Sequence, residues 1–156
     1  MQTHTENSLL SWQDITSFVH ELVCKIRASD FVPDYLIGIA RGGLIPLTLL
    51  SHELDITHIV IFSATSYRST QQGDLHITYK PSINLRDRNV LLIDEIADTG
   101  NTLYAIADIL KEEYCVGQLK TAVIAYHINN CKKLPDYYIF GNTRWIVFPW
   151  EEVLPF

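Results

Sequence analysis

The sequence predicts an α/β fold with a central, mostly parallel sheet flanked by helices. Short apolar runs, often β-branched, alternate along the chain with longer segments whose apolar residues recur at helical spacing. The predicted strands are apolar almost throughout, which is typical of strands that are buried on both faces. In such folds ligands bind beyond the carboxyl ends of the strands, so the turns that follow strands are the places to look for function.

Length, charge and cysteine usage narrow the class of protein. The 156 residues can bury one sizeable core and contain no linker-like segment, so we expect a single domain over residues 1–156. The formal net charge of −6 argues against broad attraction to nucleic acid or to an anionic membrane. Three widely spaced cysteines give no metal template, and no apolar run is long enough to span a bilayer. We therefore expect a cytoplasmic protein.

The first part of the chain reads as helix, strand, glycine turn, helix and strand. A capping-box pattern at residues 11–14 starts an amphipathic helix that ends near Ser29. The short apolar run 35–40 predicts a buried strand, a Gly-Gly pair breaks it, and residues 44–54 have a helical pattern. A β-branched run at 58–62 predicts the next strand.

The segment 63–88 differs from the rest because it is polar and poorly periodic, which predicts a mobile excursion or a β-arm. Regular patterns resume after it. The remaining predicted elements are strands at 90–94, 119–126, 137–140 and 145–147 and a helix at 102–114, with a polar loop at 129–135.

Two unusual turns follow predicted strands and precede predicted helices, one at residues 40–43 and one at residues 94–102. In the second turn, the backbone N–H groups of residues 99–102 lie at a helix start beside a glycine and two hydroxyl side chains, which predicts a cradle for one phosphate. Asp94 and Glu95 only accept hydrogen bonds, so their natural partners are sugar hydroxyls or Mg²⁺.

The first turn predicts a second anion site. Gly42 and Gly43 allow close approach to the backbone, and Arg41 brings a forked cation that suits phosphate oxygens. A ligand with a phosphate at one end, a diol in the middle and a pyrophosphate at the other end is phosphoribosyl pyrophosphate. The phosphate loop of nucleotide triphosphatases and the dinucleotide-binding glycine fingerprint are both absent from the sequence.

These two turns resemble the signature motifs of a known family. VLLIDEIADTGNTL, at residues 90–103, resembles the phosphoribosyl-pyrophosphate motif of type I phosphoribosyltransferases, and IARGGLIPLTLL, at residues 39–50, resembles their pyrophosphate loop. LPDYYIF and WIVFPWE, near the end of the chain, are similar to the closing segment of the 6-oxopurine branch. The resemblance covers the chain from about Pro33 to Glu151.

The resemblance implies a fold and an activity. The fold would carry a flexible arm at about 63–88 and a small hood formed by residues 128–156 with the N-terminal segment. The activity would be Mg²⁺-dependent transfer of phosphoribose from phosphoribosyl pyrophosphate to guanine, xanthine or hypoxanthine, which yields a nucleoside monophosphate and pyrophosphate. It also implies a homodimer or homotetramer.

The resemblance further implies roles for matching residues. Asp94 and Glu95 would hold the ribose hydroxyls and hydrated Mg²⁺, Glu151 would lie near the metal, and Asp98 would take a proton from purine N7. We expect Trp150 to pack against the sheet. The 5′-phosphate would bind to Asp98, Thr99, Gly100, Asn101 and Thr102, and pyrophosphate to Arg41, Gly42 and Gly43. The base would stack on Trp145 and form hydrogen bonds with the backbone of Ile146.

Two residues depart from the family pattern. Glu95 stands where the family usually has Asp, and His127 stands where the purine branch has a lysine that donates to the 6-oxo group. Imidazole can donate a hydrogen bond but carries no fixed charge, so we hypothesise that His127 reads the exocyclic group of the base. Two alternatives stay open: a pyrimidine or another heterocycle as the acceptor, and a non-catalytic regulator that senses phosphoribosyl pyrophosphate or nucleotides.

Overall fold

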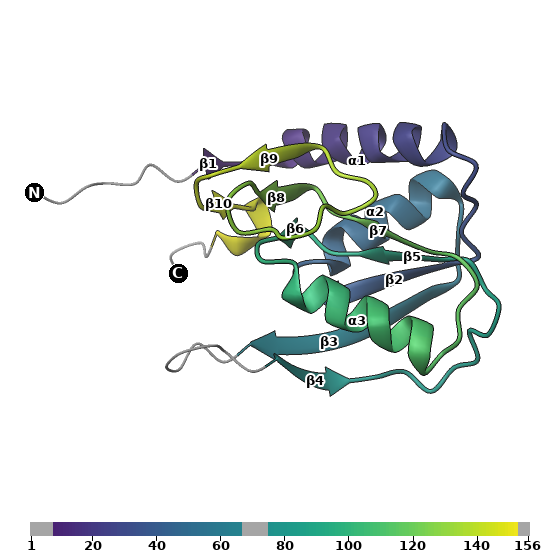
Figure 1. Ribbon diagram of the computed structural model, residues 1–156. Coiled ribbons are helices and arrows are strands. Elements are labelled where there is room, and N and C mark those ends of the chain that lie inside the picture. The colour runs from purple at the N-terminus through teal and green to yellow at the C-terminus, as the bar shows by residue number, and fades with distance from the viewer. Residues whose placement is uncertain (1–7, 67–74, 153–156) are drawn as a thin grey trace, which may run out of the picture.

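The computed structural model describes residues 8–66 and 75–152 and centres on a five-stranded sheet (Figure 1). The strands lie in the order β4-β3-β2-β5-β7, and all neighbours pair in parallel except the edge strand β4. The strands are β2 (Tyr35–Ala40), β3 (Ile59–Ser66), β4 (Leu75–Tyr79), β5 (Val90–Ile93) and β7 (Leu119–Ala122).

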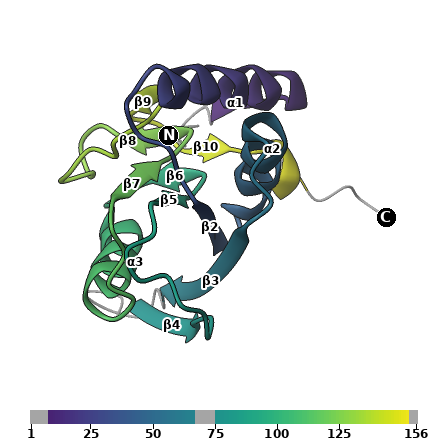
Figure 2. The same ribbon diagram turned by 90° about the vertical axis from the view of Figure 1, so that its right-hand side faces the viewer.

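Helices cover both faces of this sheet (Figure 2). Helices α1 (Trp12–Arg27) and α2 (Leu44–Leu54) lie on one face, and α3 (Asn101–Glu112) lies on the other. Successive strand residues alternate between two core clusters, so Leu36 packs with α1 and α2 whereas Ile37 packs with α3. The predicted α/β class with a sheet covered on both faces is confirmed.

The helix starts follow local chemistry. The hydroxyl of Ser11 accepts a hydrogen bond from Asp14 N at 3.1 Å, and the Asp14 carboxylate accepts one from Ser11 N at 2.8 Å, so the predicted capping box forms. Helix α1 ends at Arg27, slightly before the predicted end, while α2 has the predicted bounds. Helix α3 starts one residue earlier and ends two residues earlier than predicted.

Small sheets gather at the end of the main sheet toward which β3 points (Figure 1). One joins the two ends of the chain, because β1 (Ser8–Leu9) pairs in parallel with β10 (Ile146–Val147). The other has three parallel strands in the order β6-β8-β9, namely β6 (Ile96–Ala97), β8 (Ala125–His127) and β9 (Phe140–Asn142). Strands β1 and β6 were not predicted.

The predicted strand over 119–126 is wrong, because the chain leaves the main sheet at Val123 and enters the small sheet at Ala125. There the N–H groups of Ile124 and Ala125 donate to the carbonyl of Glu95, at 3.1 and 3.3 Å. Residues 122–125, on both sides of the break, are buried and apolar, so hydrophobicity does not mark it. The strand predicted at 137–140 is also displaced, since Tyr137 makes only an isolated bridge to Ala122 and β9 begins at Phe140.

The segment predicted as an excursion or β-arm contains a hairpin-like pair. Strand β3 runs four residues past its predicted end, to Ser66, and β4 returns antiparallel to it. A hydrogen bond from Thr78 Oγ1 to Ser63 Oγ, 2.8 Å long, links the two strands. Residues 67–74 lie outside the described part of the chain, so the mobility of the arm stays a prediction.

Asp136 fastens the segment after β8 to the main sheet. Its Oδ2 accepts hydrogen bonds from Thr121 N and Oγ1, at 2.8 and 3.0 Å, and Lys120 Nζ lies 3.2 Å from its Oδ1. Thr121 is buried on β7, so its N–H and O–H donors depend on this carboxylate, while its hydroxyl oxygen also accepts a 3.0 Å hydrogen bond from Asp136 N.

We therefore predict that Asp136→Ala lowers the free energy of unfolding by about 1–3 kcal/mol, because it leaves the buried N–H and O–H donors of Thr121 without their acceptor. Urea unfolding measures the change. Asp30→Ala removes an exposed carboxylate and serves as the control, with an expected change within about 0.5 kcal/mol. Equal stability of the two variants would contradict the role of Asp136.

Candidate active site

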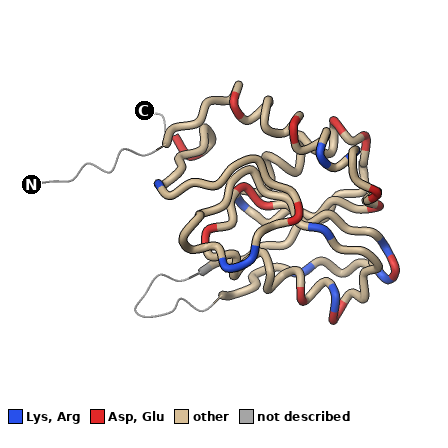
Figure 3. Tube along the Cα trace, turned by 45° about the horizontal axis from the view of Figure 1, so that its top comes forward, with Lys and Arg blue, Asp and Glu red and all other residues tan. Residues whose placement is uncertain are grey.

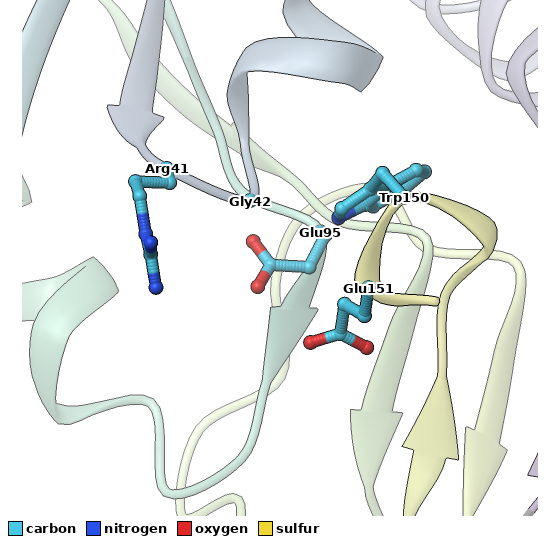
Figure 4. A pocket seen from close by; sticks show the side chains of 5 residues that line it. All are labelled: Arg41, Gly42, Glu95, Trp150 and Glu151. Atoms are coloured by element: carbon cyan, nitrogen blue, oxygen red, sulfur yellow. The ribbon is translucent and has the colours of Figure 1, made fainter. Parts of the chain in front are cut away.

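The two predicted turns face one cavity of about 570 Å³, at the carboxyl end of the main sheet (Figure 4). Arg41 and Gly42 follow β2, Glu95 follows β5, and Trp150 and Glu151 belong to the short helix η1 (Pro149–Glu151). Figure 4 shows the carboxylate of Glu95 between the side chains of Arg41 and Glu151. The volume is that of a typical small-molecule pocket.

The two glycines of the first turn allow two different close approaches. A Cβ on Gly42 would lie 2.0 Å from Cδ of Glu95, so a side chain at this position would force the Glu95 carboxylate to move. A Cβ on Gly43 would lie 2.7 Å from the carbonyl oxygen of Ile39 and 2.8 Å from that of Ile93. Gly42 therefore brings the two turns together, and Gly43 lets the first turn pack on the sheet. The Ala40–Arg41 peptide is cis.

Glu95 is held by its backbone, and its carboxylate is left incomplete. Its carbonyl accepts two hydrogen bonds from the start of β8, but Oε2 of its side chain is buried and has no hydrogen-bond partner within the described ranges. Buried polar atoms normally find a partner, so this oxygen can bind a cation or accept a hydrogen bond from a ligand or a water. Glu151 completes the cavity, with its Oε2 accepting a 2.8 Å hydrogen bond from Phe148 N.

The carboxylates of Glu95 and Glu151 suit a Mg²⁺ ion that binds together with the phosphates of a substrate. Over residues 8–66 and 75–152, no group of three His, Cys, Asp or Glu side chains is arranged to hold a metal. Mg²⁺ does not require one, since proteins commonly bind it through one or two carboxylates, with waters and substrate phosphates completing the octahedron. The unpartnered oxygen of Glu95 and the nearby Glu151 fit this kind of site.

Asp94 lies beside Glu95 but is not among the residues that line the cavity. Its Oδ1 accepts a hydrogen bond from Glu95 N at 2.9 Å. Burial of its carboxyl group, and then the neighbouring Glu95 carboxylate, raise the pKa of Asp94 well above the ordinary value. The folded protein therefore disfavours the charged form of Asp94 in the absence of a cation or a hydroxyl donor.

The predicted phosphate cradle begins α3 but does not line the cavity. Gly100, at the N-cap, has a φ of +83°, a left-handed conformation that favours glycine. Glycine provides no capping side chain, and the hydroxyl of Thr99 accepts a 3.2 Å hydrogen bond from Asn101 N. The first turn of α3, with Thr102 next in line, has the geometry of an anion site.

The predicted base-binding residues lie in the small sheets, outside the cavity lining. Trp145 is 55% exposed, whereas Ile146 is buried in β10. The carbonyls of Trp145 and Val147 accept hydrogen bonds from the β1 segment, so the carbonyl of Ile146 between them points away from β1. His127 ends β8, and its Nδ1 is buried with no partner in the described structure.

Pairing of β6 with β8 brings His127 toward Asp98. Ala97 lies opposite Tyr126 in this parallel register, and Asp98 and His127 are the next residues of the two strands. The predicted proton acceptor and the predicted base reader are therefore neighbours, although 29 positions separate them in the numbering.

Two further residues belong to this region. Trp150 packs as expected, stacked on Phe148 at 4.8 Å between ring centroids, but it also lines the cavity. Asn130 donates a 2.8 Å hydrogen bond from its amide to Oδ1 of Asp98. The sequence pattern gave Trp150 only a packing role and read Asn130 as part of a polar loop. The sequence offered one indication of these roles: Trp150 is next to Glu151, and Asn130 is close to His127.

We predict that Asp94→Asn stabilises the folded protein by about 0.5–2 kcal/mol near pH 7. The folded protein disfavours the charged carboxyl, so the wild type loses stability as pH rises from the ordinary pKa of about 3.9 through the raised value. The asparagine keeps the acceptor for Glu95 N and never ionises. Urea unfolding at several pH values measures the difference, which should shrink toward about pH 4.

The matched control for this prediction is Asp108→Asn, on the exposed side of α3, which should change stability little at any pH. An Asp94→Asn protein that is less stable than the wild type near pH 7 would show that the charged carboxylate stabilises the fold.

Comparison with known proteins identifies the family. The profile described as "Phosphoribosyl transferase domain" matches residues 6–156. The xanthine-guanine phosphoribosyltransferase of Chromohalobacter salexigens is 30% identical over 144 residues, which cover 91% of this chain and 82% of the relative.

Two solved structures have the same fold. A purine phosphoribosyltransferase from Pyrococcus horikoshii Ot3 superposes with a TM-score of 0.84 at 34% identity, covering 96% of this chain and 97% of that one. The Helicobacter pylori xanthine-guanine-hypoxanthine phosphoribosyltransferase superposes with a TM-score of 0.84 at 27% identity, covering 94% of each chain. Together with the shared cavity of the two motifs, these matches show that the chain belongs to the phosphoribosyltransferase family.

Proposed function

We propose that the protein transfers phosphoribose from phosphoribosyl pyrophosphate to a 6-oxopurine, producing a nucleoside monophosphate and pyrophosphate. The observation that carries this proposal is the single cavity in which Arg41 and Gly42 of the first turn meet Glu95 of the acidic motif. The names of the relatives, xanthine-guanine and purine phosphoribosyltransferases, support guanine, xanthine and hypoxanthine as the acceptors.

The reaction separates charge, and the cavity matches that separation. Breaking the bond between ribose C1 and pyrophosphate leaves positive charge on the sugar ring and negative charge on the leaving group. Arg41 stabilises the leaving pyrophosphate, Asp94 and Glu95 form hydrogen bonds with the ribose hydroxyls, and the carboxylate of Glu95 places negative charge near the ring. Mg²⁺, held by Glu95 and Glu151 when bound, supplies further positive charge to the leaving group.

The attacking base loses a proton as its nitrogen bonds to C1. Asp98 is the proposed proton acceptor, from N7 of the purine, and a positioned general base contributes about 10²- to 10⁴-fold in rate. The 5′-phosphate binds at residues 98–102, where α3 begins. The sugar is thereby fixed at its phosphate, its diol and its pyrophosphate.

Base recognition falls to three residues in and beside the small sheets. The unpartnered Nδ1 of His127 provides a polar contact for the exocyclic group, and the Ile146 backbone faces away from β1. Trp145 offers an indole ring, 55% exposed, on which the base can stack.

We place the enzyme in the cytoplasm, as a homodimer or homotetramer that does not bind nucleic acid. All three cysteines are free. Along the described parts of the trace, Lys and Arg are scattered among Asp and Glu (Figure 3), which does not favour binding to a phosphate backbone. In the described ranges, no helix has the length and apolar character needed to cross a bilayer.

The main test supplies the protein with Mg²⁺, phosphoribosyl pyrophosphate and a panel of purine and pyrimidine bases, and detects nucleotide by mass spectrometry. We predict turnover with at least one 6-oxopurine. Asp98→Asn should lower kcat by about 10²- to 10⁴-fold, because the amide cannot accept the proton. Calorimetry should still detect phosphoribosyl pyrophosphate binding to this variant.

The same panel separates the alternatives. Turnover with a pyrimidine alone would show that the acceptor base is not a 6-oxopurine, although the transfer reaction would be the proposed one. Binding of phosphoribosyl pyrophosphate by the wild type without turnover on any base would favour a sensing regulator instead of an enzyme.

The role of His127 generates a separate prediction. His127→Lys adds a fixed charge and should change kcat/KM by about tenfold or more for at least one of guanine, xanthine and hypoxanthine, which alters their order of preference. Steady-state kinetics on the three bases measure it. His52→Lys, on the exposed side of α2, controls for added charge, and unchanged preferences in His127→Lys would remove the assignment.

A further inference from the structure

Asp98 has one side-chain partner in the part of the chain that the structure describes. The amide of Asn130 donates to Oδ1 of Asp98 at 2.8 Å. An amide nitrogen facing a carboxylate can only donate, so the direction of this hydrogen bond is fixed. It is charge-assisted when Asp98 is ionised, and such bonds are stronger than those between neutral groups.

Asn130 lies in a loop of residues 128–134 that is fastened to the phosphate cradle and to α3. Lys132 N donates to the carbonyl of Thr99 at 3.4 Å, and the hydroxyl of Tyr104, on α3, donates to the carbonyl of Leu134 at 2.7 Å. Cys131 also lies close to Gly100, because a Cβ atom added to Gly100 would be 3.7 Å from the sulfur of Cys131. These contacts tie the loop to the cradle and to α3, which holds the amide of Asn130 close to Asp98.

The turn that carries Asn130 also fixes His127. The N–H groups of Asn130 and Cys131 donate to the carbonyl of His127, at 3.3 and 2.9 Å. The end of β8 and the amide that contacts Asp98 are thereby parts of one hydrogen-bonded turn. The relative positions of His127 and Asp98 depend on that turn as well as on the pairing of β6 with β8.

We propose that Asn130 is a positioning residue for the transfer reaction. This inference rests on the proposed function, in which Asp98 accepts the proton of the base. A carboxylate can rotate about its Cβ–Cγ bond, and a donor fixed on Oδ1 stops that rotation while leaving Oδ2 free for the substrate. Asn130 touches neither reacting atom and acts through Asp98 alone.

The kinetic test compares three variants of the full chain. Asn130→Ala removes the donor and should lower kcat about 3- to 10-fold, the size expected for one hydrogen bond, with little change in KM for phosphoribosyl pyrophosphate. Asn130→Asp has nearly the same shape but repels Asp98, so it should lower kcat further. Asn130→Gln keeps an amide donor and should recover part of the loss.

Tyr104→Phe is the matched control for the loop. It removes the hydrogen bond from Tyr104 to Leu134 but leaves the amide of Asn130 in place, so kcat should stay close to that of the wild type. A loss of kcat in Tyr104→Phe equal to that in Asn130→Ala would show that both act only by holding the loop. Unchanged kcat in Asn130→Ala would overturn the inference directly.

A spectroscopic test does not require turnover. In the ¹⁵N spectrum of the wild-type protein, one side-chain amide proton of Asn130 should resonate downfield of free amides, and Asp98→Ala should remove that shift. A signal that ignores Asp98→Ala would overturn the inference. Inactivity of the wild type on every base would reject the proposed function and this inference together, whereas unchanged kcat in Asn130→Ala rejects the inference alone.

Discussion

The approach of the Glu95 carboxylate to Gly42 is the contact on which the site depends. Any side chain at position 42 would displace this carboxylate, so the close contact between the two motif turns depends on glycine at position 42. The parallel pairing of β2 with β5 brings both turns to the same end of the sheet. The backbone of Glu95 then fixes the start of β8 through two hydrogen bonds, which ties the small sheet to the same point.

The elements that the sequence predicted well are those whose boundaries are set locally. Strand β2 and helix α2 have their predicted bounds because an apolar run, a glycine pair and a helical pattern follow one another without overlap. The chemistry of the two turns was equally local, since the residues that identify each turn are adjacent. Their meeting in one cavity required only the rule that parallel strands share a carboxyl end.

What the sequence could not predict depends on contacts between distant residues. The break between β7 and β8 is set by the carbonyl of Glu95, about 30 residues earlier, and the flanking residues are all apolar. The hydrogen bond from Asn130 to Asp98 joins residues 32 positions apart. A polar residue in a loop carries no sign of such a partner, and an aromatic residue such as Trp150 does not reveal which of its faces meets a cavity.

The acidic motif of Asp94 and Glu95 is unfavourable for the fold in the absence of a ligand. Burial and the proximity of Glu95 raise the pKa of Asp94, and one oxygen of Glu95 has no partner. A neutral apolar ligand would provide no partner for the Asp94 and Glu95 carboxyl groups. A sugar diol donates hydrogen bonds to carboxylates, and a phosphate-bound cation neutralises their charge. The motif therefore favours a ligand that combines hydroxyls with a metal-bound anion, as phosphoribosyl pyrophosphate does. The two core clusters on either side of the sheet supply the stability that keeps this unsatisfied site folded between turnovers.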